Sequence, residues 1–301
     1  MSDEALSELL AEVRRIEVQS HRLVTDVLAG GYRTTFRGHG VEFAEVREFV
    51  EGDDLRAVDW NVTARLGRPF VKRFVEEREH TLVFVLDLSA SMDGGLGAWS
   101  LRQLAARFCA CLGLAAIDND DRVGLVAGSD GVERFVPPQK GVRHVLRIVR
   151  DCLVLRGRSR HGDLGALVAH ANRSLRRRSV LFVLSDFLSP GGERELALGA
   201  RRHDLVAVRL QPLEHARPPR ALLRVRDPES GRAATVDFAN ARVRAAWHDR
   251  IAAARARLDD RFARAGIDCI DLAVPERGDL AAIARPLRAF FHRRELREAK
   301  R

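Results

Sequence analysis

One carboxylate and two hydroxyls stand two residues apart directly after an apolar stretch of the chain. Residues 81–88 read TLVFVLDL, and the polar side chains are Asp87, Ser89 and Ser91. Carboxylate and hydroxyl oxygens are hard donors, which suit Mg²⁺ and Mn²⁺. The spacing therefore predicts a divalent-cation site in the turn that follows a buried strand. The alternative is that Asp87 caps the turn and the serines cap the next helix.

A second apolar stretch ends in a carboxylate about a hundred residues later. Residues 179–186 read SVLFVLSD and end at Asp186. In a parallel sheet the carboxyl ends of neighbouring strands meet at one edge, where ligands bind. We therefore expect Asp186 to join Asp87 and the two serines at a single site.

Strand-like and helix-like segments alternate after His80, which is typical of an α/β protein with helices on both faces of a mostly parallel, doubly wound sheet. Apolar stretches predict strands at 81–88, 121–128, 132–138, 179–186, 203–211 and 267–274. Helical periodicity predicts helices at 101–118, 143–155, 163–177, 193–202, 239–266 and 278–291. A polar, proline-rich, hairpin-like stretch occupies residues 212–240.

The first eighty residues have a different character. Apolar spacing predicts a helix over 4–29, residues 40–50 suggest a short helix, and residues 68–78 alternate like an exposed strand. We expect three parts. Residues 1–80 form an N-terminal helical and charged extension, residues 81–291 a sheet domain, and residues 292–301 a frayed basic tail.

These motifs resemble known families. Residues 81–278 are similar to a von Willebrand factor type A domain, whose metal-ion-dependent adhesion site reads DxSxS, then a threonine, then an aspartate. With the upstream block of residues 37–77, the pattern GDDxRxxDW…AR…DxSxSM resembles the bacterial domain-of-unknown-function family numbered fifty-eight. The resemblance implies a Rossmann-like fold and cation ligands at Asp87, Ser89, Ser91 and Asp186.

The threonine of that pattern is missing from this chain. The segment RHGDLG places Gly162 where the threonine is expected. Ser159, Asp163 or a water molecule is the candidate replacement. We therefore expect Mg²⁺ or Mn²⁺ to bind weakly.

The resemblance also implies a partner. Such proteins are typically encoded beside a MoxR-type AAA+ ATPase and are thought to act with it in chaperone-like assembly or activation of other protein complexes. A cation held mostly by neutral hydroxyls stays electrophilic and can accept a partner's carboxylate as its last ligand. We expect a non-enzymatic protein-interaction module whose client the sequence does not specify.

The upstream residues that match the family block form a second candidate group, which comprises Gly52, Asp53, Asp54, Arg56, Asp59, Trp60 and Arg65. Ion pairs between the acids at 53 and 54 and the arginines at 56 and 65 would pin this segment to the sheet domain. Trp60 would be an apolar anchor. A partner-binding or regulatory role is the alternative.

Two other function classes remain open. A phosphatase-like, metal-dependent hydrolase would use Asp87 as its nucleophile, but such enzymes usually carry a second aspartate where this chain has Ser89. A net charge of +9 with a pI near 10.4 admits a basic nucleic-acid-binding module. That module would need interleaved aromatic residues, and the three tryptophans lie far apart in the sequence.

Sequence features that are absent from the chain argue against further classes of function. The chain contains no GxxxxGK[ST] pattern, which argues against ATP binding by a P-loop. Its N-terminus lacks a signal-peptide layout, and no uncharged apolar run approaches the length of a membrane span. We expect a cytoplasmic protein without a membrane span.

Overall fold

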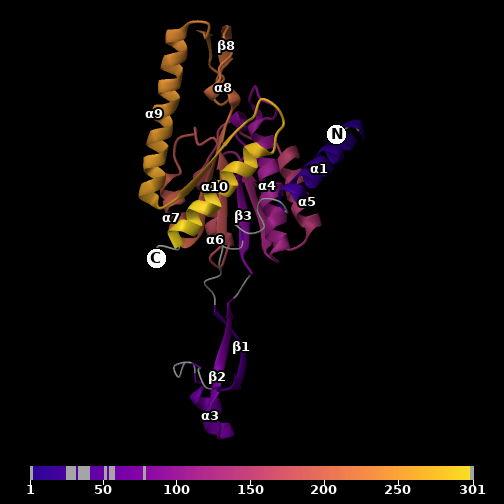
Figure 1. The fold of residues 1–301 in the computed structure, drawn as a ribbon. Helices are drawn as coiled ribbons and strands as arrows, with labels where there is room; N and C mark the ends of the chain where they lie inside the picture. The colour runs from indigo at the N-terminus through magenta and orange to yellow at the C-terminus, as the bar shows by residue number, and fades with distance from the viewer. Residues whose placement is uncertain are drawn as a thin grey trace. The chain divides into compact units, whose positions relative to one another are not determined.

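The computed structural model describes residues 3–24, 32, 41–50, 53, 58–76 and 79–298. The chain divides into two compact units, and Figure 1 shows the elements of each. The larger unit joins Met1–Thr35 with Thr81–Arg301, and the smaller one is Phe36–His80. The N-terminal helix, which we expected in the extension, therefore belongs to the same unit as the sheet.

A six-stranded sheet of order β10-β7-β6-β3-β4-β5 forms the centre of the larger unit. All neighbours in it run parallel except β5, which is antiparallel to β4. The strands are β3 (Thr81–Asp87), β4 (Arg122–Gly128), β5 (Val132–Gln139), β6 (Val180–Ser185), β7 (Asp204–Gln211) and β10 (Asp268–Ala273). This arrangement confirms the expected mostly parallel sheet and all six predicted strands.

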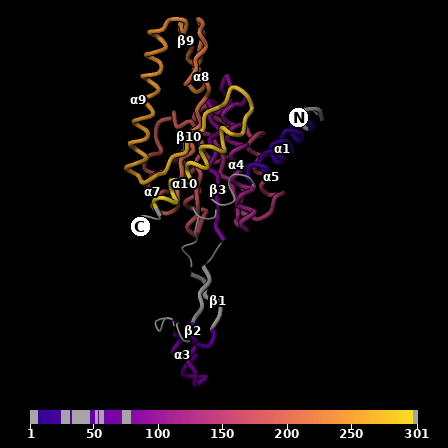
Figure 2. Tube along the Cα trace, viewed as in Figure 1, coloured from indigo at the N-terminus to yellow at the C-terminus, as the bar shows by residue number. Residues whose placement is uncertain are grey.

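Helices cover both faces of this sheet, as Figure 2 traces. On one face α4 and α5 pack against the strands, and α1 packs against both of these helices. On the other face α6 and α7 pack against the strands, and α9 packs beside α7. The helix α10 lies against β10. The helices are α1 (Asp3–Leu23), α4 (Leu101–Asp118), α5 (Val142–Val154), α6 (Leu164–Ser174), α7 (Glu193–Arg202), α9 (Ala241–Ala265) and α10 (Ala281–Glu298).

Alternate residues of β3 build the two halves of the core, because successive side chains of a strand point to opposite faces. Phe84 packs against Phe108 of α4, with ring centroids 6.4 Å apart. Val83 and Val85 join the cluster that α6, α7 and α9 cover. The unbroken apolar sequence of β3 therefore reflects burial on both faces.

The most apolar helix, α4, lies within this core. Its residues from Leu101 to Ala116 are all buried except Gln103. Cys109 and Cys111 are free, buried thiols, and burial raises the pKa of Cys111 to about 11. Within the part of the chain that the structure describes, no helix has the length and apolarity needed to cross a membrane.

Shorter elements complete the larger unit. The 3₁₀ helix η3 (Ala90–Asp93) follows β3, and the short helix α8 (Leu213–Ala216) follows β7. The strands β8 (Leu222–Arg226) and β9 (Ala233–Asp237) then form an antiparallel hairpin. Phe238 packs at right angles on Trp247 of α9, with centroids 5.4 Å apart, so the end of the hairpin is anchored to that helix. The hairpin-like interpretation of residues 212–240 is confirmed.

The smaller unit contains β1 (Val41–Glu48), α3 (Trp60–Leu66) and β2 (Phe70–Glu76), and β1 pairs antiparallel with β2. The short helix expected at residues 40–50 is therefore wrong. The pairing register shifts between Phe43 and Glu45. This bulge interrupts the alternation that would have identified a strand in the sequence.

The expected frayed tail is also wrong over residues 292–298, because α10 continues to Glu298. Arg294 donates to Asp204 at 2.6 and 2.7 Å and to Asp268 at 2.8 Å. These acids stand at the starts of β7 and β10. A tertiary ion-pair network therefore holds the last turns of the helix in place.

His203 makes stability depend on pH. It is fully buried, its Nδ1 accepts a hydrogen bond from the Ser179 backbone at 3.2 Å, and burial lowers its pKa to about 4. An unfolded histidine has a pKa of about 6.5. Between pH 6.5 and pH 4 the unfolded chain therefore binds more protons than the folded one, and the stability of the fold decreases as the pH falls through this range.

From pH 7 to pH 4.5, we expect the wild type to lose about 2 kcal/mol more unfolding free energy than His203→Gln, measured by urea denaturation.

The exposed His248 of α9 provides the matched control. The His248→Gln variant should follow the wild-type pH profile. Equal losses in the wild type and in His203→Gln would contradict the prediction.

Candidate functional site

The predicted cation ligands lie at the carboxyl ends of β3 and β6, which are neighbours at the centre of the sheet. The chain leaves β3 towards β4 on one side and leaves β6 towards β7 on the other. The strand order therefore reverses between β3 and β6. In open α/β sheets this switch point leaves a crevice in which ligands bind.

Asp87 occupies the base of this site and is only 1% exposed. Its Oδ1 accepts a hydrogen bond from the Ser89 backbone at 2.8 Å, and its Oδ2 accepts one from the Ser185 hydroxyl at 2.7 Å. Burial raises the pKa of Asp87 despite these bonds. Sequence reasoning did not assign Ser185, although the Ser-Asp pair at the end of its strand was visible.

The two motif serines and Asp186 complete the cluster. The hydroxyls of Ser89 and Ser91 lie 3.2 Å apart. The Ser91 side chain is near enough to Asp186 to oppose, in part, the effect of burial on its pKa. Asp186 accepts from the Leu188 backbone at 3.0 Å, and burial raises its pKa to about 6. The structure therefore brings together all four side chains that we predicted as cation ligands.

A strained turn follows Asp186. Phe187 has φ of +56°, a left-handed conformation that side chains other than glycine rarely adopt. Its backbone N–H donates to the Ser185 hydroxyl at 2.9 Å, and its ring packs at 80° on Phe262 with centroids 5.2 Å apart. These contacts hold the turn, and such strain is typical of functional sites.

The loop before α6 lies against the turn that carries the motif. The Ala90 backbone donates to the Arg160 carbonyl at 3.0 Å. A Cβ at Gly157 would stand 2.2 Å from the Leu88 carbonyl oxygen. A Cβ at Gly162 would stand 3.0 Å from Asp87 Oδ1 and 3.2 Å from the Ser189 hydroxyl. The position at which the family pattern has threonine is therefore directly beside Asp87.

The two candidate replacements for that threonine have other roles in the described part of the chain. The Ser159 hydroxyl accepts from the His161 backbone at 3.2 Å. Asp163 is exposed and caps α6 by accepting from the Ala166 backbone at 2.9 Å. Both residues therefore shape the loop and the helix start beside the site.

A further carboxylate reaches the site from the β8–β9 hairpin. Glu229 accepts a hydrogen bond from the Ser189 hydroxyl at 2.7 Å. Its charge contributes to raising the pKa of both Asp87 and Asp186, after the larger effect of burial. Sequence reasoning missed Glu229, because the segment DPESG indicates a turn and carries no sign of where that turn packs.

No group of three or more His, Cys, Asp or Glu side chains in the described residues is arranged to hold a metal ion. The cluster described above consists instead of two carboxylates and two hydroxyls.

A family described as "Protein of unknown function DUF58" matches residues 45–257. The chain belongs to this family. The DUF58 protein is 30% identical to uncharacterized protein Mb1516 of Mycobacterium bovis over 228 residues. The aligned region covers 74% of this chain and 72% of the relative. Uncharacterized protein Rv1480 of Mycobacterium tuberculosis matches with the same identity and coverage.

Two solved structures show more distant similarity. Conserved hypothetical protein BatB from Bacteroides thetaiotaomicron is 14% identical, with a TM-score of 0.44 over 71% of this chain and 99% of that one. An aerotolerance-related membrane protein from Bacteroides fragilis is also 14% identical, with a TM-score of 0.43 over 72% of this chain and 99% of that one.

The charged block of this DUF58 protein is arranged differently from our expectation. Asp53 pairs with Arg47 through two hydrogen bonds of 2.6 and 2.8 Å, and these bonds lower its pKa. Its described partner is therefore the end of β1 rather than Arg65, and the predicted network with Arg56 stays a prediction. Arg65 is exposed in the last turn of α3. Gly52, Asp54 and Arg56 lie outside the described residues.

Asp59 and Trp60 mark the start of α3. Asp59 is the N-cap and accepts from the backbones of Asn61 at 3.0 Å and Val62 at 3.3 Å. Trp60 is 70% exposed at the start of this short helix, which has no buried residues. Its role as an apolar anchor stays a prediction.

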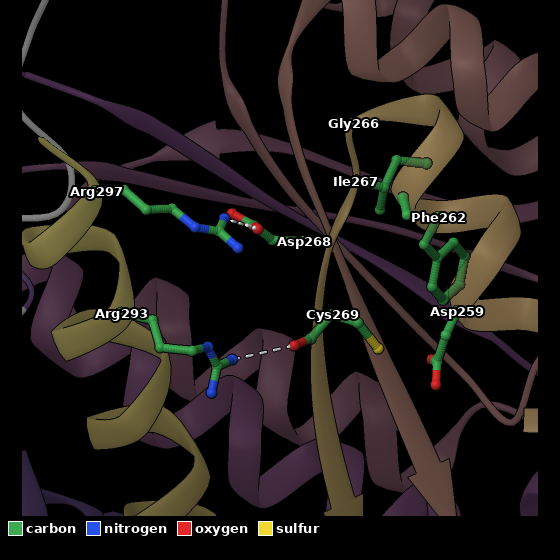
Figure 3. A pocket seen from close by; sticks show the side chains of 9 residues that line it. Asp259, Phe262, Gly266, Ile267, Asp268, Cys269, Arg293 and Arg297 are labelled. Atoms are coloured by element: carbon green, nitrogen blue, oxygen red, sulfur yellow. Dashed lines mark hydrogen bonds and ion pairs between the residues drawn. The ribbon is translucent and has the colours of Figure 1, made fainter. Parts of the chain in front are cut away.

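A cavity of about 440 Å³ lies elsewhere in the DUF58 protein, between α9, the start of β10 and α10. Figure 3 shows Arg293 directed at the Cys269 carbonyl and Arg297 at Asp268. Burial raises the pKa of Cys269 to about 12, which disfavours the reactive thiolate form. The lining residues are thus paired with one another, and the polar cluster at the switch point remains the candidate site.

The close approach at Gly157 makes the site sensitive to a single methyl group. The Gly157→Ala change forces the loop away from the Leu88 carbonyl, and we expect it to cost about 2 kcal/mol of unfolding free energy in urea denaturation. Gly131 is the matched control, since nothing lies within 4 Å of its Cβ position. Gly131→Ala should change stability by less than about 0.5 kcal/mol. Equal stability of the two variants would contradict the packing described here.

Proposed function

We propose that this protein is a non-enzymatic protein-interaction module whose binding site contains a divalent cation. The observation that carries the proposal is the convergence of Asp87, Ser89, Ser91 and Asp186 at the switch point of the sheet. The same four positions match the adhesion-site pattern of von Willebrand factor type A domains. The mostly parallel sheet with one antiparallel edge strand is compatible with that fold.

The donor set fits a hard cation such as Mg²⁺ or Mn²⁺. Its atoms are carboxylate and hydroxyl oxygens, and the two carboxylates balance the ion's charge. Gly162 lets the neighbouring loop approach these donors closely, because a Cβ there would lie only 3.0 Å from Asp87 Oδ1 and 3.2 Å from the Ser89 Cβ and the Ser189 hydroxyl. The residues that would hold the cation are therefore Asp87, Ser89, Ser91 and Asp186.

A bound cation would supply electrostatic attraction for an acidic group of a partner. The protein's own residues orient this site. Ser185 holds Asp87 at 2.7 Å, and the turn at Phe187 presents Asp186. Because Asp87 and Asp186 are both buried, their charges are weakly screened by solvent and attract a cation strongly. The family resemblance supports a MoxR-type AAA+ ATPase as partner, in assembly or activation of protein complexes.

Cation binding should require the Asp87 carboxylate. In calorimetric titrations with Mg²⁺ and Mn²⁺, Asp87→Asn should weaken binding at least tenfold, which corresponds to about 1.4 kcal/mol. Asparagine keeps the shape and removes the charge, and its amide nitrogen cannot accept one of the two hydrogen bonds that the carboxylate accepts from Ser89 and Ser185. Asp260→Asn, at an exposed position of α9, is the control and should bind as the wild type does. Equal binding by the wild type and Asp87→Asn would contradict the proposed site.

Partner binding should depend on the same cation. We expect a MoxR-type ATPase from the same organism to co-elute with the wild type in Mg²⁺ and to separate from it in EDTA. Asp87→Asn should fail to co-elute in either buffer, although its circular dichroism and melting temperature match the wild type. A complex that persists in EDTA and in Asp87→Asn would show that the partner binds elsewhere.

A further inference from the structure

The side chains at the candidate site are covered in this structure. Asp87 and Ser89 are each 1% exposed, and Asp186 is 6% exposed. A partner's carboxylate can coordinate a cation held among them only through an open path, because coordination requires direct contact. Some part of the chain beside the cluster must therefore move before a partner can bind.

Two loops border the cluster. The loop before α6 contacts the turn after β3, since the Ala90 backbone donates to the Arg160 carbonyl at 3.0 Å. The loop after β6 carries Ser189, whose hydroxyl lies 3.2 Å from the position that a Cβ at Gly162 would take. Asp87 Oδ1 lies 3.0 Å from the same position. The two loops therefore meet beside the Asp87 carboxylate.

The tip of the β8–β9 hairpin bridges these two loops. The Arg160 guanidinium donates to the Pro228 carbonyl from Nε at 2.8 Å and from a terminal nitrogen at 2.5 Å. Glu229 accepts from the Ser189 hydroxyl at 2.7 Å, and its other carboxylate oxygen lies 3.6 Å from His161 Nδ1. The hairpin tip is therefore fastened to the loop on each side.

The tip has a shape of its own. Asp227 Oδ1 accepts from the backbones of Glu229 at 3.0 Å and Ser230 at 3.4 Å. Its Oδ2 accepts from the Ser230 hydroxyl at 2.6 Å. Hydrogen bonds of this kind fix the backbone of a turn. The tip therefore keeps its conformation without the help of the two loops and can move as one piece.

The body of the hairpin, which Figure 1 shows beside α9, is held loosely. Every residue of β8 and β9 is exposed or only partly buried. At the other end of the hairpin Phe238 is buried against Trp247 of α9, with ring centroids 5.4 Å apart. Segments with little buried apolar surface open at low cost in free energy. The hairpin is therefore anchored at its base by apolar packing and fastened at its tip by polar contacts.

We propose that the β8–β9 hairpin is a latch that closes the candidate site. Through Pro228 and Glu229 the tip holds the loops at residues 157–163 and 187–192 together beside the cluster. Release of the tip, with the packing of Phe238 as the pivot, lets the loops separate and opens a path to the buried side chains. A partner binds only after this release, a consequence that rests on the proposed function.

Thiol labelling in EDTA tests the latch on the full chain without any cation. Ser91 is a partly buried member of the cluster, and Ser91→Cys places a thiol there. Arg160→Ala combined with Glu229→Ala removes the side chains that fasten the tip. We expect this double change to speed labelling of the position-91 thiol by iodoacetamide about fivefold, measured by mass spectrometry of the labelled peptide.

Glu193→Ala combined with Arg261→Ala is the matched control. These two side chains form a half-exposed ion pair of 2.7 Å between α7 and α9. Their removal should leave the labelling rate at position 91 unchanged. Cys109, which is fully buried in the core, reports general loosening and should label slowly in every variant.

Hydrogen exchange provides a readout that a merely structural role of the tip would not change. The latch-breaking double change should speed exchange of the amides at residues 229–231 about tenfold. It should also speed exchange of the Leu188 amide, which donates to Asp186 Oδ1 at 3.0 Å, about threefold. Faster exchange confined to the tip would overturn the latch, because it would show that the hairpin does not cover the cluster.

The outcomes separate this inference from the proposed function. Equal labelling at position 91 in the latch-breaking and control variants would overturn the latch, and so would equally faster labelling of Cys109. If Mn²⁺ binding still depends on Asp87, either result leaves the proposed function intact. Absence of Mn²⁺ binding by the wild type would overturn the proposed function, and the labelling rates would decide the latch independently.

Discussion

The carboxylate of Asp87 joins the two central strands of the sheet, and the rest of the candidate site depends on it. Its oxygens accept hydrogen bonds from the Ser89 backbone, in the turn after β3, and from the Ser185 hydroxyl at the end of β6. A buried carboxylate needs such donors, because an unsatisfied charged group in the core is strongly destabilising. The turn and the strand end are therefore held in one geometry, with the motif serines and Asp186 arranged around it.

Close backbone approach is the second constraint. The loop before α6 can lie on the turn after β3 only because positions 157 and 162 carry no side chain. At Gly157 this permits direct contact with the Leu88 carbonyl, and at Gly162 it permits close approach to the Asp87 carboxylate and the Ser189 hydroxyl. The same loop donates from Arg160 to the hairpin tip. Four segments that are far apart in the sequence thus meet at one edge of the sheet.

The remaining charge of this arginine-rich chain serves mainly to join elements. Arg294 connects α10 to the starts of β7 and β10, and Arg47 holds the turn after β1 through Asp53. Arg209 pairs with Asp259 and Asp271, which links β7 to α9 and β10. Such paired arginines are unavailable to phosphate groups. These three arginines are therefore engaged within the fold.

The sequence by itself determined the six strands of the central sheet, most of the helices and the four residues that meet at the switch point. These features are local, because apolar runs identify buried strands and polar residues at strand ends identify the ligand-binding edge. Only the tertiary structure revealed the strand β1, whose bulge interrupts its alternation, and the continued helix at residues 292–298, which depends on Arg294. It also placed Ser185 against Asp87 and Glu229 against Ser189. Those contacts join residues 98 and 40 positions apart, and no local pattern specifies which distant turn will pack on which strand end.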